Sequence, residues 1–74
     1  MREEQRNENR RMVQLLQMIR GEFLEIPGLR LTRNQVQDLW GLDAEARDTI
    51  LDTLTAAGFL KETGDGAFIR AQDG

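Results

Sequence analysis

Apolar residues recur at intervals of three and four in the first third of the chain, with polar residues between them. This spacing is typical of an amphipathic helix packed along one face, and its apolar positions are Met12, Leu15, Leu16, Ile19, Phe23 and Ile26. Gly21 lies inside this predicted helix and costs about 1 kcal/mol relative to alanine, so either a neighbour packs closely against it or the helix is locally weak. Pro27 and Gly28 end the helix, because the residue before a proline avoids the α conformation and glycine favours a turn.

A short strand and a second helix are predicted next. Residues 29–31 alternate apolar, charged and apolar, which indicates a very short strand with Arg30 facing water. The Thr32 hydroxyl can accept hydrogen bonds from the free N–H groups at the start of a helix over residues 33–40. We expect the inward side of this second helix to carry Val36, Leu39 and Trp40.

A third helix is predicted over residues 44–57. Gly41 ends the second helix, Leu42 points back into the core, and the Asp43 carboxylate caps the third helix. Its inward positions are apolar, and they are Ile50, Leu51 and Leu54. At about 100° per residue, the carboxylates of the opposite side fall within a stripe roughly 60° wide, and they are Glu45, Asp48 and Asp52.

A hairpin closes the predicted domain. Gly58 is the glycine expected after the third helix, and residues 59–63 and 67–71 form two strands joined by the Gly-Asp-Gly turn of residues 64–66. These elements predict a mainly α (α+β) fold, in which a three-helix bundle shares its core with a small antiparallel β-hairpin. We expect residues 1–11 to be a polar flexible arm, residues 12–71 to be the domain, and residues 72–74 to be a tail.

Composition limits the chemistry that is open to this chain. Its 74 residues make a single domain, and it has neither cysteine nor histidine. These absences remove thiolate and imidazole metal ligands, a cysteine nucleophile and the commonest general base, so we expect no enzyme activity, no cofactor and no metal site. The sequence shows neither a signal-peptide core nor a membrane-spanning stretch, and we therefore expect a cytoplasmic protein without membrane contacts.

Charge is distributed unevenly along the chain. The formal net charge is −3 with a pI near 4.8. Residues 1–30 contain six arginines and five glutamates, which gives +1, whereas residues 31–74 contain four basic and eight acidic groups, which gives −4. The overall sign argues against a general attraction to nucleic acid but leaves room for a local basic face.

Two stretches of the sequence resemble the winged helix-turn-helix family of small bacterial DNA-binding proteins. These stretches are "LTRNQVQDLWGLD" and "ILDTLTAAGFLKETGDGAFIR", and the resemblance covers residues 12–71. The family's helix-opening hydroxyl, its turn between the second and third helices and its later apolar and glycine positions are matched here by Thr32, Val36, Gly41, Leu42, Asp43, Leu51, Leu54, Gly58 and Phe59. The turn at residues 64–66 matches the tip of the family's wing.

The resemblance implies a transcriptional regulator that binds DNA as a homodimer. Its DNA contacts would come from the arm, the start of the second helix, the third helix and the wing, through Arg10, Arg11, Arg33, Thr49, Thr53 and Arg70.

The sequence departs from the family where DNA would be read. Glu45, Asp48 and Asp52 occupy the outward side of the third helix, where phosphate would repel them. Arg47 stands at a usually apolar position, and Gln37 stands where the family has a small alanine. The alternative function is therefore a protein-protein interaction module, without DNA binding, that docks the acidic third helix on a basic surface of a partner.

Overall fold

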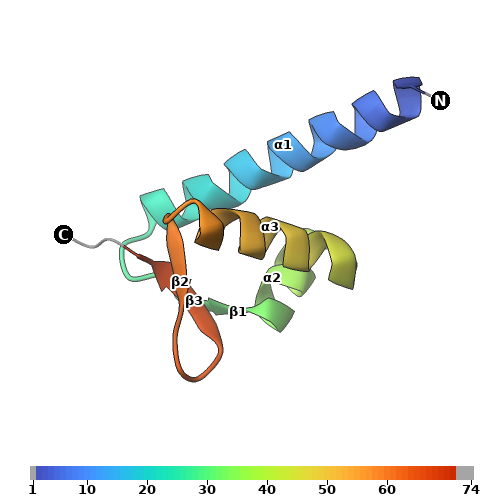
Figure 1. Ribbon diagram of the computed structural model, residues 1–74. Coiled ribbons are helices and arrows are strands. Elements are labelled where there is room, and N and C mark those ends of the chain that lie inside the picture. Colours follow the sequence, from blue (N-terminus) through green and yellow to red (C-terminus); the bar gives the residue numbers. More distant parts are fainter. Residues whose placement is uncertain (1, 72–74) are drawn as a thin grey trace.

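The computed structural model describes the backbone of residues 2–71 and the side chains of residues 9–71, so the predicted tail lies outside the described residues. Three helices and a three-stranded antiparallel sheet make up the fold (Figure 1), in the order α1 (Arg2–Glu25), β1 (Leu31–Thr32), α2 (Arg33–Trp40), α3 (Ala44–Ala56), β2 (Leu60–Glu62) and β3 (Ala67–Arg70). The predicted mainly α, α+β class is confirmed. No helix within residues 2–71 combines the length and the apolar character that a membrane crossing requires.

Helix α1 is longer than its apolar pattern predicts. It begins at Arg2, whereas the pattern places its start at Met12, so the residues of the predicted arm continue the same helix. Figure 1 shows the N-terminal turns of α1 projecting past the end of α3, and the molecule measures 42 Å along its longest axis and 22 Å along the next. The polar first half of α1 is therefore presented away from the rest of the fold.

The core lies where α1, α3 and the sheet meet. Its buried apolar side chains come from every helix and from all three strands, and they are Ile19, Phe23, Leu31, Val36, Ile50, Leu51, Leu54, Leu60, Ala67 and Phe68. Two positions expected on inward faces are exposed instead, Ile26 by 45% and Leu39 by 62%. Helix α1 ends at Glu25, so Ile26 has left the helical periodicity. Leu39 lies about 60° around α2 from the buried Val36, on the side away from the core.

Local capping sets the ends of α2 and α3 as predicted. The Gln35 N–H donates to the Thr32 hydroxyl at 3.2 Å, while the Thr32 N–H donates to the Gln35 side chain at 2.9 Å, which forms a reciprocal capping box. Gly41 has φ of +62°, a left-handed conformation that suits glycine, and it ends α2. The Ala46 N–H then donates to the Asp43 carboxylate at 2.8 Å and begins α3.

The sheet has the strand order β1-β3-β2, with both pairs antiparallel. The first strand is shifted from the predicted residues 29–31 to Leu31–Thr32, so Arg30 lies just before it. β2 is one residue shorter than predicted at each end, and β3 lacks the predicted last residue. At the hairpin turn the Thr63 N–H donates to the Ala67 carbonyl at 2.7 Å, and Asp65 contacts both the Thr63 hydroxyl and the Arg30 guanidinium. The Thr63 hydroxyl, and after it the charge of Arg30, lower the pKa of Asp65 below its ordinary value.

Gly21 has no close neighbour within the described part of the chain. Nothing lies within 4 Å of the position that a Cβ would occupy. Of the two explanations that the sequence leaves open, close packing is therefore wrong, and the helix carries a locally weak position.

Candidate functional site

The acidic side of α3 is not a free row of carboxylates, because arginines hold its middle member. Arg33 at the start of α2 donates to Asp48 at 2.7 Å, and Arg47 donates through Nε to the same oxygen at 2.9 Å. The hydrogen bond from Arg47 is the main cause that lowers the pKa of Asp48 below its ordinary value, and Arg33 adds to it. Asp48 is therefore occupied within the fold.

Arg33 joins four elements of the fold through one guanidinium. Besides Asp48, it lies 3.6 Å from Asp52 and 3.9 Å from Glu62, and it sits over the Phe68 ring at 5.0 Å from the centroid. We call these four charged residues, Arg33, Asp48, Asp52 and Glu62, the Arg33 cluster. The predicted DNA contact at Arg33 is thus held by carboxylates of α3 and β2, because the first turn of α2 places it between the acidic stripe and the hairpin.

The two departures from the family pattern on α2 and α3 meet each other. Arg47 donates through Nη1 to the Gln37 side-chain oxygen at 2.8 Å, and its side chain is only 18% exposed. The hydrogen bond to Asp48 raises the pKa of Arg47 above its ordinary value. A polar contact therefore stands between these helices where the family pattern implies an apolar one.

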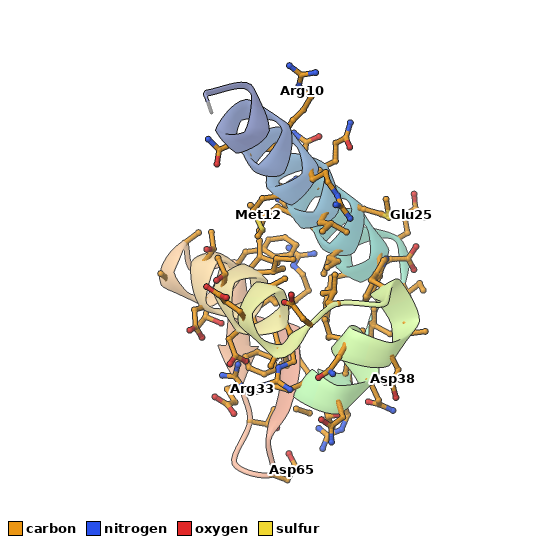
Figure 2. The ribbon with its side chains drawn as sticks, turned by 90° about the vertical axis from the view of Figure 1, so that its right-hand side faces the viewer. Arg10, Met12, Glu25, Arg33, Asp38 and Asp65 are labelled. Atoms are coloured by element: carbon orange, nitrogen blue, oxygen red, sulfur yellow. The ribbon has the colours of Figure 1, made fainter. Side chains whose placement is uncertain are left out.

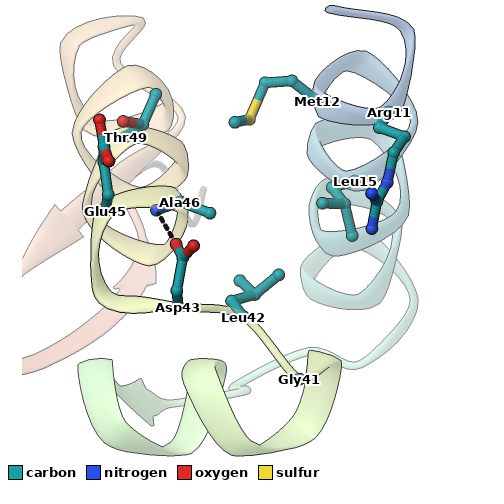
Figure 3. Close-up of a pocket in the computed structure, with 9 residues that line it drawn as sticks. All are labelled: Arg11, Met12, Leu15, Gly41, Leu42, Asp43, Glu45, Ala46 and Thr49. Atoms are coloured by element: carbon teal, nitrogen blue, oxygen red, sulfur yellow. Dashed lines mark hydrogen bonds between the residues drawn. The ribbon is translucent and has the colours of Figure 1, made fainter. Parts of the chain in front are cut away.

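A groove opens between the middle of α1 and the start of α3. Its volume is about 400 Å³, and its apolar lining consists of Met12, Leu15, Leu42 and Ala46. Figure 3 shows Met12 extending from α1 toward α3, with Leu42 at the base of the groove. The groove forms because α1 continues past the turn between α2 and α3, so the two helices enclose an apolar strip.

Polar residues stand around this apolar strip. Glu45 and Thr49 line the groove from α3, Asp43 lines it at the cap of that helix, and Arg11 lines it from α1. The structure thus brings together Arg11, Glu45 and Thr49, which the sequence assigned to two different functions. Thr53 is exposed one turn further along α3.

The remaining predicted contacts lie apart from this groove. Figure 2 shows Arg10 projecting from one end of the molecule and Arg33 lying near the hairpin at the other. Arg70 does not project from the outer side of the hairpin: it pairs across the sheet with the buried Leu60, and directly paired residues share a face of the sheet. Its guanidinium lies over the Phe59 ring at 4.8 Å from the centroid. The six predicted DNA contacts therefore do not form one surface.

Sequence reasoning missed Arg20. Its guanidinium lies over the same Phe59 ring, 5.0 Å from the centroid, and so joins α1 to the residue just before β2. Its position on the flank of the apolar stripe of α1 could have indicated this contact, because long basic side chains reach along apolar surfaces from such positions.

Comparison of the chain with models of protein families, with curated proteins and with solved structures found no significant match. Two surfaces of the described residues have the features of a binding site. One is the groove with its acidic rim on α3, and the other is the pair of arginines on Phe59.

Proposed function

We propose that this chain is a winged-helix domain that acts by binding and not by catalysis, and that it docks a basic, amphipathic segment of a partner protein in the groove between α1 and α3. The order of helix, strand, two helices and hairpin supports the winged-helix assignment, since β1 pairs with the last strand of the hairpin and places α2 and α3 on the sheet.

One observation carries the choice of a protein partner over DNA: Arg33 is held by three carboxylates. A phosphate group that approached α3 would have to displace Asp48 from a 2.7 Å contact and would then face the carboxylates left behind. The groups exposed on this side of α3 are Glu45, Asp52, Thr49 and Thr53, which suit cationic side chains of a protein better than a phosphate backbone.

The groove supplies the apolar contact surface that acidic side chains alone do not offer. Protein interfaces combine a buried apolar centre with a polar rim, and Met12, Leu15 and Leu42 provide apolar atoms beside the rim residue Glu45. A partner helix with apolar residues at helical spacing and lysine or arginine beside them would fit both features. The charges would then set the orientation and the association rate more than the affinity.

A matched pair of double variants tests this proposal. Glu45→Lys with Thr49→Arg changes the charge of the groove rim by +3, while Asn34→Arg with Asp38→Lys makes the same change on two exposed positions of α2, also one turn apart. Each variant would be cross-linked in cells to any bound protein, and affinities for the captured protein would then be measured at several salt concentrations. We expect the α3 variant to bind at least tenfold more weakly and the α2 variant to bind like wild type. Equal binding by the two variants would reject this groove as the docking site.

DNA binding is measured in parallel. Fluorescence anisotropy of a labelled random duplex at about 20 mM salt, where charge screening is weak, should show no binding at micromolar protein. Binding that appears there and weakens steeply as salt rises would reject the protein-docking proposal in favour of a DNA-binding regulator.

A further inference from the structure

A second face of α1 carries arginine and apolar side chains at regular spacing. Positions 10, 13, 17, 20 and 24 follow one another at intervals of three and four, so they share one side of the helix. Val13 is 50% exposed and Leu24 is 46% exposed. We call this set the Arg20 face, and it consists of Arg10, Val13, Gln17, Arg20 and Leu24. It lies on roughly the opposite side of α1 from Met12 and Leu15, which line the groove.

The centre of the Arg20 face adjoins a second arginine on the same aromatic ring. The guanidinium of Arg20 lies 5.0 Å and that of Arg70 lies 4.8 Å from the centroid of Phe59. Among the side chains of residues 9–71, no carboxylate forms an ion pair with either of them, and the buried Nε of Arg70 has no hydrogen-bond partner. Within residues 9–71, these two cations therefore share a contact with the Phe59 ring and have no carboxylate to balance their charge.

Two arginines beside one ring, without a carboxylate partner, can bind an anion. Two like charges beside one ring repel each other, and the attraction of each cation to the aromatic face offsets this only in part. A guanidinium that stacks on a ring still presents N–H groups along its edge, in a geometry that suits a carboxylate. A carboxylate between or beside the two arginines would relieve the repulsion and accept these hydrogen bonds.

We propose that the Arg20 face, together with Arg70 and Phe59, docks an acidic amphipathic helix of a partner protein. Aspartate or glutamate side chains of that helix meet Arg20 and Arg70, and its apolar side chains cover Val13 and Leu24. The exposed apolar residues decide for a protein helix over nucleic acid, because a phosphate backbone offers them no apolar complement.

Charge also decides against a second copy of the chain on this face. Two Arg20 faces packed on each other would bring two cationic surfaces together, with no carboxylate among the five residues of either face to balance them. Like charges across an interface cost binding energy, whereas an acidic partner gains it.

Selection from a displayed library of random 16-residue peptides tests the proposal without a known partner. Wild-type protein should enrich peptides that carry aspartate or glutamate beside apolar residues at helical spacing. The selected peptides are then measured against Arg20→Glu and against Lys61→Glu, which makes the same charge change at an exposed position of β2. Circular dichroism confirms that each variant is folded.

We expect the peptides to bind Arg20→Glu at least tenfold more weakly and Lys61→Glu like wild type. They should bind the groove variant, Glu45→Lys with Thr49→Arg, without loss, which separates this face from the groove proposed above. The proposal is overturned if the selection yields no binders or binders without acidic residues, or if Arg20→Glu and Lys61→Glu weaken binding equally. It is also overturned if ultracentrifugation finds a dimer that Arg20→Glu dissociates, since a second copy would then occupy the face.

Discussion

Three arginines stack on phenylalanine rings, but their charges are balanced differently. Arg33 stacks on one ring, and Arg20 and Arg70 share another. Each guanidinium lies about 5 Å from the centre of a phenylalanine ring, Phe68 for Arg33 and Phe59 for the other two. Arg33 also has three carboxylates within 4 Å, whereas the described side chains offer none as an ion-pair partner to Arg20 or Arg70. The charge of Arg33 is thus balanced inside the molecule, and the charges on Phe59 are left for something outside it.

The role of an arginine thus depends on its neighbours in space. On a family pattern, Arg33 and Arg70 are equivalent candidates for a phosphate contact. In the fold, Arg33 connects α2, α3 and the hairpin, while Arg70 shares the Phe59 ring with Arg20 of α1. The same cluster explains part of the acidic side of α3. Asp48 is there to balance the charges of Arg33 and Arg47, and not only to face a partner.

Removing either phenylalanine ring should change the stability of the fold, and Phe68 should matter most. Phe68 is buried in the core and Phe59 is only partly buried. Phe68→Ala should lower the free energy of unfolding by about 3–5 kcal/mol, the usual cost of removing a buried aromatic ring. Phe59→Ala should cost clearly less and should weaken binding of the acidic peptides. Urea denaturation compares the two variants, and equal losses of stability would contradict the distinction between a structural ring and a docking ring.

A smaller effect is expected in the helix that carries Arg20. Gly21 is helical and has open space around its Cβ position, so Gly21→Ala should raise the free energy of unfolding by about 1 kcal/mol. Gly58 has φ of +81°, so Gly58→Ala should lower it, because a side chain strains that conformation. Thermal unfolding of both variants checks these signs. A stabilised α1 should also leave the peptide affinity of the Arg20 face unchanged or improved, since the substitution touches neither arginine.

A still smaller effect is expected on the stability of the fold at low pH. The pKa of Asp48 is lowered in the folded state, chiefly by the hydrogen bond from Arg47, so its ion pairs stabilise the fold above the unfolded-state pKa. That contribution is lost as the pH falls below the ordinary aspartate range, from about pH 4 downward. Asp48→Asn should therefore lower the melting temperature at neutral pH and reduce its fall between about pH 5 and 2.

Asp38→Asn supplies the control for this experiment. Asp38 is an exposed carboxylate on α2, and no arginine within residues 9–71 pairs with it. Its substitution should leave the acid slope as in wild type. If Asp48→Asn keeps the full slope as well, the Arg33 cluster does not stabilise the fold through charge.

Several features of this fold depend only on a few neighbouring residues and can be predicted without the tertiary structure. The capping box at Thr32, the left-handed Gly41, the Asp43 cap and the hairpin turn are all made by groups within four residues of one another, so local chemistry predicts them. The buried faces of α1 and α3 follow from periodicity for the same reason, as Ile19, Phe23, Ile50 and Leu51 show.

The partners of the long charged side chains and the exposure of some apolar residues depend on how the helices and the sheet pack. The contact between Arg33 and Asp48 joins residues fifteen positions apart in the sequence. The rings that contact the three arginines are Phe68 in the hairpin and Phe59 just before it. Leu39 satisfies the helical pattern and is still exposed, since nothing within α2 says how far around the helix the core extends. A guanidinium on a flexible stem can reach several partners, and its choice depends on how helices and sheet pack, which no single stretch of sequence encodes.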